Sequence, residues 1–115
     1  MNAQNCPFCK IVSGQIPAEI VTRSAHSIAF RDLNPKAPAH LLVIPERHAR
    51  DLGEFVATAS ADEVADLFKL ASDVGRAASP TGYRVVTNEG VDAGQSVFHL
   101  HLHVLAGRAL AWPPG

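Results

Sequence analysis

Three histidines stand at alternate positions of one apolar run, VFHLHLHVL, which covers residues 97–105. A period of two is the spacing of a β-strand, so we expect His99, His101 and His103 on one face and the residues between them on the other. The chain has six histidines, and a strand that carries half of them on one face by chance is the less favoured explanation. The run therefore predicts a strand with one packing face and one chemically active face.

The rest of the sequence shows several short period-two segments and one long segment with a helical period. Turn residues separate expected strands at 19–24, 27–33, 40–46, 83–88 and 97–107. A short helix is expected over residues 6–14, and a long one over 60–78 begins with a capping box of Ser60 and Glu63. The apolar stripe of the long helix consists of Val64, Leu67, Phe68, Ala71, Val74 and Ala78.

This order of elements predicts an α+β fold. We expect a five-stranded antiparallel sheet, covered on one face by the long helix, together with a short N-terminal helix. The histidine face of the sheet is then expected to be the uncovered face.

Length and charge narrow the class of protein. A chain of 115 residues with 47% hydrophobic side chains has the size of one compact domain, so we expect a single domain over residues 1–115. Ten basic and eleven acidic residues give a net charge of −1, which provides no field to attract nucleic acid or an anionic membrane. The sequence has no apolar run near the roughly 20 residues of a membrane span and no signal-peptide pattern. We expect a cytoplasmic protein without a nucleic-acid or membrane partner.

The segment NEGVDAGQS, residues 88–96, directly precedes the histidine run. Its glycines allow backbone N–H groups to approach an anion, and phosphate is the anion we expect there. A neutral imidazole can attack phosphorus to form a covalent intermediate, while N–H donors balance the charge without a catalytic metal. The alternatives are acid-base chemistry by the histidines and a catalytic metal on the row. The metal is disfavoured because no carboxylate accompanies the row in sequence.

The run His99-Leu-His101-Leu-His103-Val-Leu resembles the signature of the histidine triad (HIT) family. Similarity to its Hint-like branch extends over nearly the whole chain, through FCKIVSGQIPAEIV, AFRDLNPKAPAHLLVIPERH and the C-terminal WPPG. The resemblance implies a single HIT domain that acts as a hydrolase or transferase at the α-phosphate of purine nucleoside phosphoramidates or related conjugates. A nucleotidyl-histidine intermediate would form, and a nucleoside monophosphate would be released. A nucleotide-binding scaffold or regulatory protein with incidental hydrolysis is the alternative.

The resemblance also implies roles for individual residues. His101 looks like the nucleophile, His103 like a contact to the α-phosphate, and Asp32 like the carboxylate that holds the ribose hydroxyls. The other catalytic or phosphate-pocket positions are Ser96, His40, Gln95 and Asn88, and the walls of the purine pocket are Phe8, Ile11, Phe30, Leu33 and Leu42. Without the resemblance, Asp32 would be interpreted as the cap of a turn and the apolar side chains as ordinary core.

Two further expectations concern a metal and a partner. Cys6 and Cys9 have the Cys-x-x-Cys spacing of half a zinc site, and His48 and His99 can complete a structural zinc site if the N-terminal helix folds over the end of the sheet. The alternative is two reduced cysteines without a ligand. The resemblance implies a homodimer in which two five-stranded sheets join into one sheet of ten strands.

Overall fold

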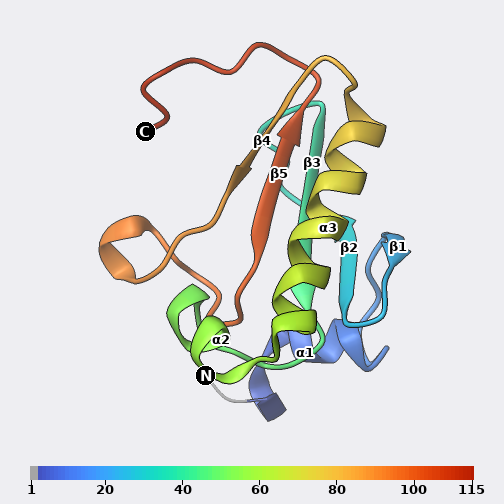
Figure 1. The fold of residues 1–115 in the computed structure, drawn as a ribbon, viewed down its shortest axis with the longest axis vertical. Helices are drawn as coiled ribbons and strands as arrows, with labels where there is room; N and C mark the ends of the chain where they lie inside the picture. Colours follow the sequence, from blue (N-terminus) through green and yellow to red (C-terminus); the bar gives the residue numbers. More distant parts are fainter. Residues whose placement is uncertain (1–2) are drawn as a thin grey trace.

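The structure is a computed structural model that describes residues 3–115, and it contains a five-stranded antiparallel sheet with helices packed against it (Figure 1). The strand order is β1-β2-β3-β5-β4, so the first three strands form a meander and β5 lies between β3 and β4. This confirms the predicted fold class. The strands are β1 Ile20–Arg23, β2 Ser27–Arg31, β3 Ala39–Pro45, β4 Tyr83–Val86 and β5 Leu102–Ala106; the helices are α1 Pro7–Val12, α2 Leu52–Thr58 and α3 Ala61–Ala78, with short 3-10 turns at Ala3–Asn5 and Val91–Ala93.

Helix α3 packs along one face of the sheet, over β2, β3 and β5 (Figure 1). Its capping box forms as predicted, because the side chains of Ser60 and Glu63 each accept a hydrogen bond from the other residue's N–H. The prediction was wrong for Phe68 and for Ala78. Phe68 is 45% exposed, since it lies about 100° around the helix from the buried Leu67, and Ala78 is exposed at the end of the helix. The core between α3 and the sheet contains Ala29, Leu41, Val43, Phe55, Leu67, Leu70, Ala71, Val74, Leu100, Leu102 and Val104.

Helix α2 is missing from the sequence-based prediction. It has seven residues, which is too short for a helical period to stand out in the sequence. Asp51 caps it by accepting a hydrogen bond from the Glu54 N–H at 2.9 Å, and Phe55 anchors it in the core. None of the helices within residues 3–115 has the length and apolar character needed to cross a membrane.

Strand β5 is shorter than predicted, because it begins at Leu102 instead of residue 97. The backbone before it bonds to partners outside the sheet. The Leu100 N–H donates to the Ala49 carbonyl at 2.8 Å, and the His101 carbonyl accepts from Thr87 Oγ1 at 2.9 Å. Of the three histidines, only His103 therefore lies within the strand.

The histidine face of the sheet is not uncovered, contrary to the prediction. Helix α1 packs against it, and the Phe8 ring meets the rings of His99 and His101 edge to face, with centroids 5.9 and 5.2 Å away. His99 is 0% exposed and His101 is 7% exposed. This second core consists of Cys6, Phe8, Ile11, Ile28, Phe30, Leu42 and Ile44. The alternating histidine and apolar side chains of this run therefore point to two buried faces of the sheet, one under α1 and one under α3.

Candidate active site and metal cluster

His101 has one ring nitrogen fixed by the backbone and one left free. Its Nδ1 lies 2.8 Å from the carbonyl oxygen of His99. Because a carbonyl only accepts, this contact assigns the proton of neutral His101 to Nδ1. The Nε2 atom then carries a lone pair, which is the form of imidazole that can attack an electrophile.

His103 is fixed in the opposite sense through His40. The Lys36 N–H donates to His40 Nδ1 at 2.9 Å, so neutral His40 has its proton on Nε2. That Nε2 lies 2.9 Å from His103 Nδ1, which accepts, and the proton of His103 is assigned to its own Nε2. Burial, reinforced by the neighbouring His101 and His40, lowers the pKa of His103 to about 4. A neutral donor, His103 Nε2–H, thus stands beside His101, at a ring-centroid separation of 5.0 Å.

Asp32 caps a turn and also lies at the histidine site, so both interpretations from the sequence apply to it. Its Oδ1 accepts a hydrogen bond from the Asn34 N–H at 2.7 Å, as a turn cap does. Its Oδ2 lies 3.4 Å from His40 Nε2, and Asp32 lines the same cavity as His101 and His103. The turn therefore aims one carboxylate oxygen at the histidines.

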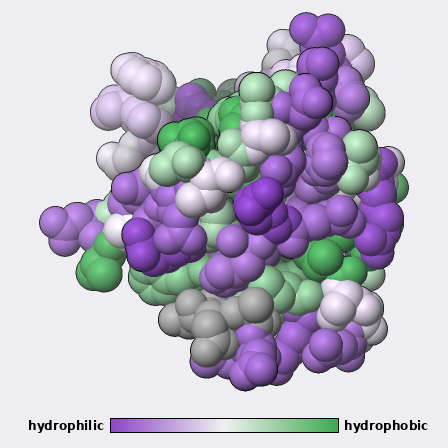
Figure 2. Space-filling model, turned by 60° about the horizontal axis from the view of Figure 1, so that its bottom comes forward, coloured by the Kyte–Doolittle hydropathy of each residue, from purple (hydrophilic) through white to green (hydrophobic). Residues whose placement is uncertain are grey.

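A cavity of about 330 Å³ opens in front of these groups. Nine of its lining residues come from the sequence-based prediction, and its apolar side is made by α1, β2 and β3. Leu33 lines it at the mouth, where the side chain is 98% exposed. The predicted residues in the lining are Phe8, Ile11, Phe30, Asp32, Leu33, Leu42, Ser96, His101 and His103. Figure 2 views the molecule with the end that carries α1 and α2 turned forward, and hydrophobic residues form small patches between hydrophilic ones there.

Two predicted phosphate-pocket residues lie away from the cavity wall. Gln95 is buried beneath the loop, where its side-chain oxygen accepts from the Gly90 N–H and its amide donates to the carbonyls of Arg50 and Val97. Asn88 lies earlier in the same loop and is not among the residues that line the cavity. The structure therefore places Gln95 as a brace for the loop that presents Ser96.

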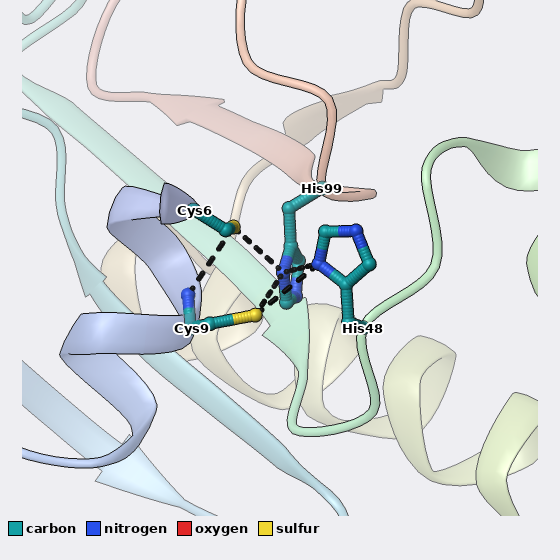
Figure 3. Close-up of side chains that lie close together, drawn as sticks. All are labelled: Cys6, Cys9, His48 and His99. Carbon is teal, nitrogen blue, oxygen red and sulfur yellow. Dashed lines mark hydrogen bonds between the residues drawn. The ribbon is translucent and has the colours of Figure 1, made fainter. Parts of the chain in front are cut away.

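The four predicted metal ligands come together at the end of the sheet next to α1 (Figure 3). The Sγ atoms of Cys6 and Cys9 lie 3.4 and 3.5 Å from His99 Nδ1. His48 Nδ1 lies 3.2 Å from Cys9 Sγ and 3.2 Å from His99 Nδ1. Tetrahedral zinc with ordinary Zn–S and Zn–N bonds places neighbouring ligand atoms about 3.3–3.8 Å apart. The cluster fits that spacing.

Hydrogen bonds around the cluster also suit a metal. His99 Nε2 donates to the Pro45 carbonyl at 2.9 Å, which leaves Nδ1 with a lone pair directed at the sulfurs. The Cys9 N–H donates to Cys6 Sγ at 3.3 Å. Without a metal, burial and the nearby Cys6 raise the pKa of Cys9 to about 12. Metal binding at this cluster would therefore release a thiol proton.

Asp32, His40 and His103 form a second group whose ligand atoms approach one another closely. The sequence-based argument against a metal here, that no carboxylate accompanies the histidine row, was wrong, because the fold brings Asp32 to the row. The tautomer of His40 disfavours a metal at this group. The Lys36 N–H occupies His40 Nδ1, so the proton is held on Nε2, the same atom that a metal would need. The group is built as a hydrogen-bonded chain.

Several functional groups have no signal in the sequence. The Lys36 N–H and the Pro45 and His99 carbonyls set the histidine tautomers, but backbone groups are common to all residue types. The cavity is also lined by residues that were not predicted, because their place in the wall depends on tertiary packing. These residues are Pro7, Ile16, Pro17, Ala18, Arg31 and Val97.

Known proteins are similar to this chain in both sequence and fold. The HIT domain family profile matches residues 13–110. A 13.2 kDa HIT-like protein of Azospirillum brasilense is 45% identical over 108 residues, which cover 92% of this chain and 88% of the relative. The crystal structure of a HIT family hydrolase from Legionella pneumophila Philadelphia 1 is 42% identical, with a TM-score of 0.90, over 96% of this chain and 100% of that chain. A histidine triad protein from Clostridium difficile is 39% identical, with a TM-score of 0.86, over 96% and 97% of the two chains. This chain belongs to the histidine triad (HIT) family.

Proposed function

We propose that this protein is a hydrolase that cleaves nucleotide conjugates at the α-phosphate, with purine nucleoside phosphoramidates as the preferred substrates. The observation that carries the proposal is the hydrogen bond from His101 Nδ1 to the His99 carbonyl, which leaves His101 Nε2 as a lone pair at the cavity. A HIT family hydrolase is among the similar solved structures, and that name supports hydrolysis as the reaction class.

The reaction proceeds by two displacements at phosphorus. His101 Nε2 attacks the α-phosphorus, the P–N bond to the leaving amine breaks, and the amine takes up a proton from solvent as it departs. Water then attacks the phosphorus and returns a proton to solvent, the P–N bond to His101 breaks, and the nucleoside monophosphate leaves while His101 Nε2 regains its lone pair. His103 Nε2–H donates to a phosphoryl oxygen, and Ser96 is placed to donate to the phosphate or the leaving group.

The rest of the cavity suits a purine nucleoside. Phe8, Ile11, Phe30 and Leu42 are buried apolar side chains along one side of it, and they offer faces and edges to an aromatic base. Asp32 lines the cavity, and its carboxylate can accept hydrogen bonds from the ribose hydroxyls. Leu33 adds apolar surface at the mouth, and the involvement of Asn88 and Gln95 with phosphate stays a prediction.

Turnover and trapping test the reaction. Adenosine 5′-phosphoramidate is expected to yield AMP, and acid-quenched protein is expected to carry an adenylyl group on the peptide that contains His101. His101→Ala is expected to abolish both signals. His26→Ala, in the exposed turn between β1 and β2, is the matched control and is expected to behave as wild type. Tight nucleotide binding with no turnover would support the scaffold alternative instead, and normal turnover by His101→Ala would refute His101 as the nucleophile.

We propose that Cys6, Cys9, His48 and His99 hold a structural zinc ion. Bound zinc supplies a cross-link between α1, the loop after β3 and the segment before β5, and it takes no part in the chemistry. Near-stoichiometric zinc is expected in protein purified without a histidine tag. Reduced protein that contains no zinc after purification in zinc-supplemented buffer would contradict this site.

We also propose a homodimer in which two sheets join through β4. This strand is at the edge of the sheet, and it exposes Val85, while α3 exposes Phe68. Light scattering coupled to size exclusion is expected to give about twice the mass of the chain, and Val85→Lys is expected to shift it to the monomer. A monomeric wild type would refute this part of the proposal.

The net charge of −1 and the absence of a spanning helix in residues 3–115 favour a protein without nucleic-acid or membrane partners, in the cytoplasm.

A further inference from the structure

One proton of the active site has two acceptors within reach. The Nε2 atom of His40 lies 2.9 Å from His103 Nδ1 and 3.4 Å from Asp32 Oδ2. The Lys36 N–H occupies the other nitrogen of His40, so the ring offers only this one proton. Asp32 and His103 therefore share a single donor.

The shared donor is shielded from solvent, because the side chain of His40 is 4% exposed, whereas that of Asp32 is 18% exposed. Asp32 lines the cavity and has its Oδ1 engaged by the Asn34 N–H, so Oδ2, the oxygen next to His40, is the one left to accept from a ligand. Any group that donates a hydrogen bond to Oδ2 weakens the attraction between this oxygen and the His40 proton.

We propose that His40 is a positioning residue that couples the occupation of Asp32 by a vicinal diol to the strength of His103 as a hydrogen-bond donor. The coupling rests on the proposed function, in which the ribose of the substrate lies at Asp32. When the diol donates to Oδ2, the His40 Nε2–H donates fully to His103 Nδ1. The His103 ring is then polarised, and its Nε2–H donates more strongly to a phosphoryl oxygen on which negative charge grows. No covalent bond changes in this coupling.

The consequence is that the sugar hydroxyls act on turnover as well as on binding. A diol that contacts Asp32 alone would lower KM and leave kcat unchanged, since it would bind the ground state and the transition state equally. A diol that also strengthens His103 raises kcat. The split between KM and kcat therefore separates a coupled carboxylate from a simple binding group.

A cycle of two substrates and two proteins tests the coupling. Adenosine 5′-phosphoramidate and its 2′,3′-dideoxy analogue are compared in wild type and in His40→Leu, with His26→Ala as the control. In wild type and in the control, the ribo substrate is expected to have a kcat about fivefold higher, the effect of one modest hydrogen bond. In His40→Leu the two kcat values are expected to be equal, while the KM difference persists. A wild-type kcat ratio of one, or an unchanged ratio in His40→Leu, overturns the proposal.

A spectroscopic measurement covers the case in which His40→Leu does not fold. The ¹⁵N shifts of the imidazoles are recorded for wild type saturated with adenosine or with 2′,3′-dideoxyadenosine, neither of which can react. His103 is expected to carry its proton on Nε2, and its Nδ1 shift is expected to move further with adenosine. Identical His103 shifts in the two complexes, or a proton on Nδ1, overturns the coupling. Failure of wild type to hydrolyse either phosphoramidate refutes the proposed hydrolase function, whereas hydrolysis with a kcat ratio of one refutes the coupling alone.

Discussion

In each of two neighbouring histidine clusters, a backbone carbonyl accepts a hydrogen bond from one ring nitrogen of a histidine. The nitrogen that donates is Nε2 in one cluster and Nδ1 in the other. In the cluster near α1, His99 Nε2 donates to a carbonyl and Nδ1 is left free, and it points at two sulfurs. In the cavity, His101 Nδ1 donates to a carbonyl and Nε2 is left free. The chemistry open to each ring is thus decided by the nitrogen that the backbone occupies.

The partners around the free nitrogens also differ. Around His99 Nδ1, thiols and a second imidazole converge, which is a set of donor atoms for a cation. Around His103 and His40, donors and acceptors alternate from the Lys36 N–H to the cavity, which leaves a proton in each contact. Convergent lone pairs make a metal site, and an alternating chain makes a site that positions protons.

Substitution of His101 is the strongest test of this comparison. His101→Ala is expected to lower kcat by at least about 10³-fold, because it removes the proposed nucleophile. The zinc content should stay near one per chain, since none of the four ligand atoms belongs to His101. Turnover is measured with adenosine 5′-phosphoramidate and zinc by elemental analysis. Loss of zinc together with activity would show that the two clusters are not independent.

Substitution of a ligand should produce the reverse pattern. Cys9→Ser is expected to lose zinc and to lower Tm by about 10 °C or more, since a metal cross-link contributes directly to the folding free energy. Phe8 lies between the cluster and His101, so KM should rise several-fold before kcat falls. Calorimetry and steady-state kinetics check this, and treatment of wild type with a chelator is the parallel measurement. A fall in kcat at unchanged KM would contradict the assignment.

The low pKa of His103 predicts a pH effect on stability. Folded His103 takes up a proton only near pH 4, whereas the unfolded chain does so near the ordinary value of 6.5. Between pH 7 and pH 5 the unfolded state therefore binds more protons, and the free energy of unfolding falls as the pH is lowered. His103→Asn is expected to reduce this fall by on the order of 1 kcal/mol. Urea titrations of both proteins at pH 7 and pH 5 check it, and equal slopes would show that His103 does not stay neutral.

The smallest effect is expected for a contact outside both clusters, between α2 and the loop that precedes the histidines. Glu89 Oε1 accepts from the Gly53 N–H at 2.8 Å and so joins the loop before the histidines to α2. This contact is exposed, so Glu89→Ala is expected to cost less than about 1 kcal/mol of stability. Zinc content and kcat should stay within about twofold of wild type by this reasoning. A larger loss of kcat would mean that the loop position depends on α2.

The sequence was a good guide where spacing decides the structure. Alternation placed the histidines on the face away from α3, and Cys-x-x-Cys with two histidines predicted the cluster that the fold brings together. It failed where tertiary contacts decide. The backbone of Leu100 bonds to Ala49, which delays the start of β5, and α1 buries a face that was expected to be open.

The tautomers could not be predicted at all. They depend on the Pro45 carbonyl and the Lys36 N–H, which are distant from His99 and His103 in sequence and reach them only in the folded chain. The exposure of Phe68 and Leu33 has a similar origin, since each is apolar but lies outside the surfaces that the sheet and helices cover.

The register between β3 and β5 has a consequence for the length of any ligand. Leu42 lies directly opposite His103 across the two strands, and both side chains line the cavity. Under the proposed function, the wall that meets the base and the donor that meets the phosphate are therefore one cross-strand pair. The span between an aromatic ring and a phosphorus atom is fixed by the pairing of two central strands and cannot be adjusted by a loop. Analogues lengthened by one methylene between sugar and phosphorus should lose either the ring contact or the attack geometry.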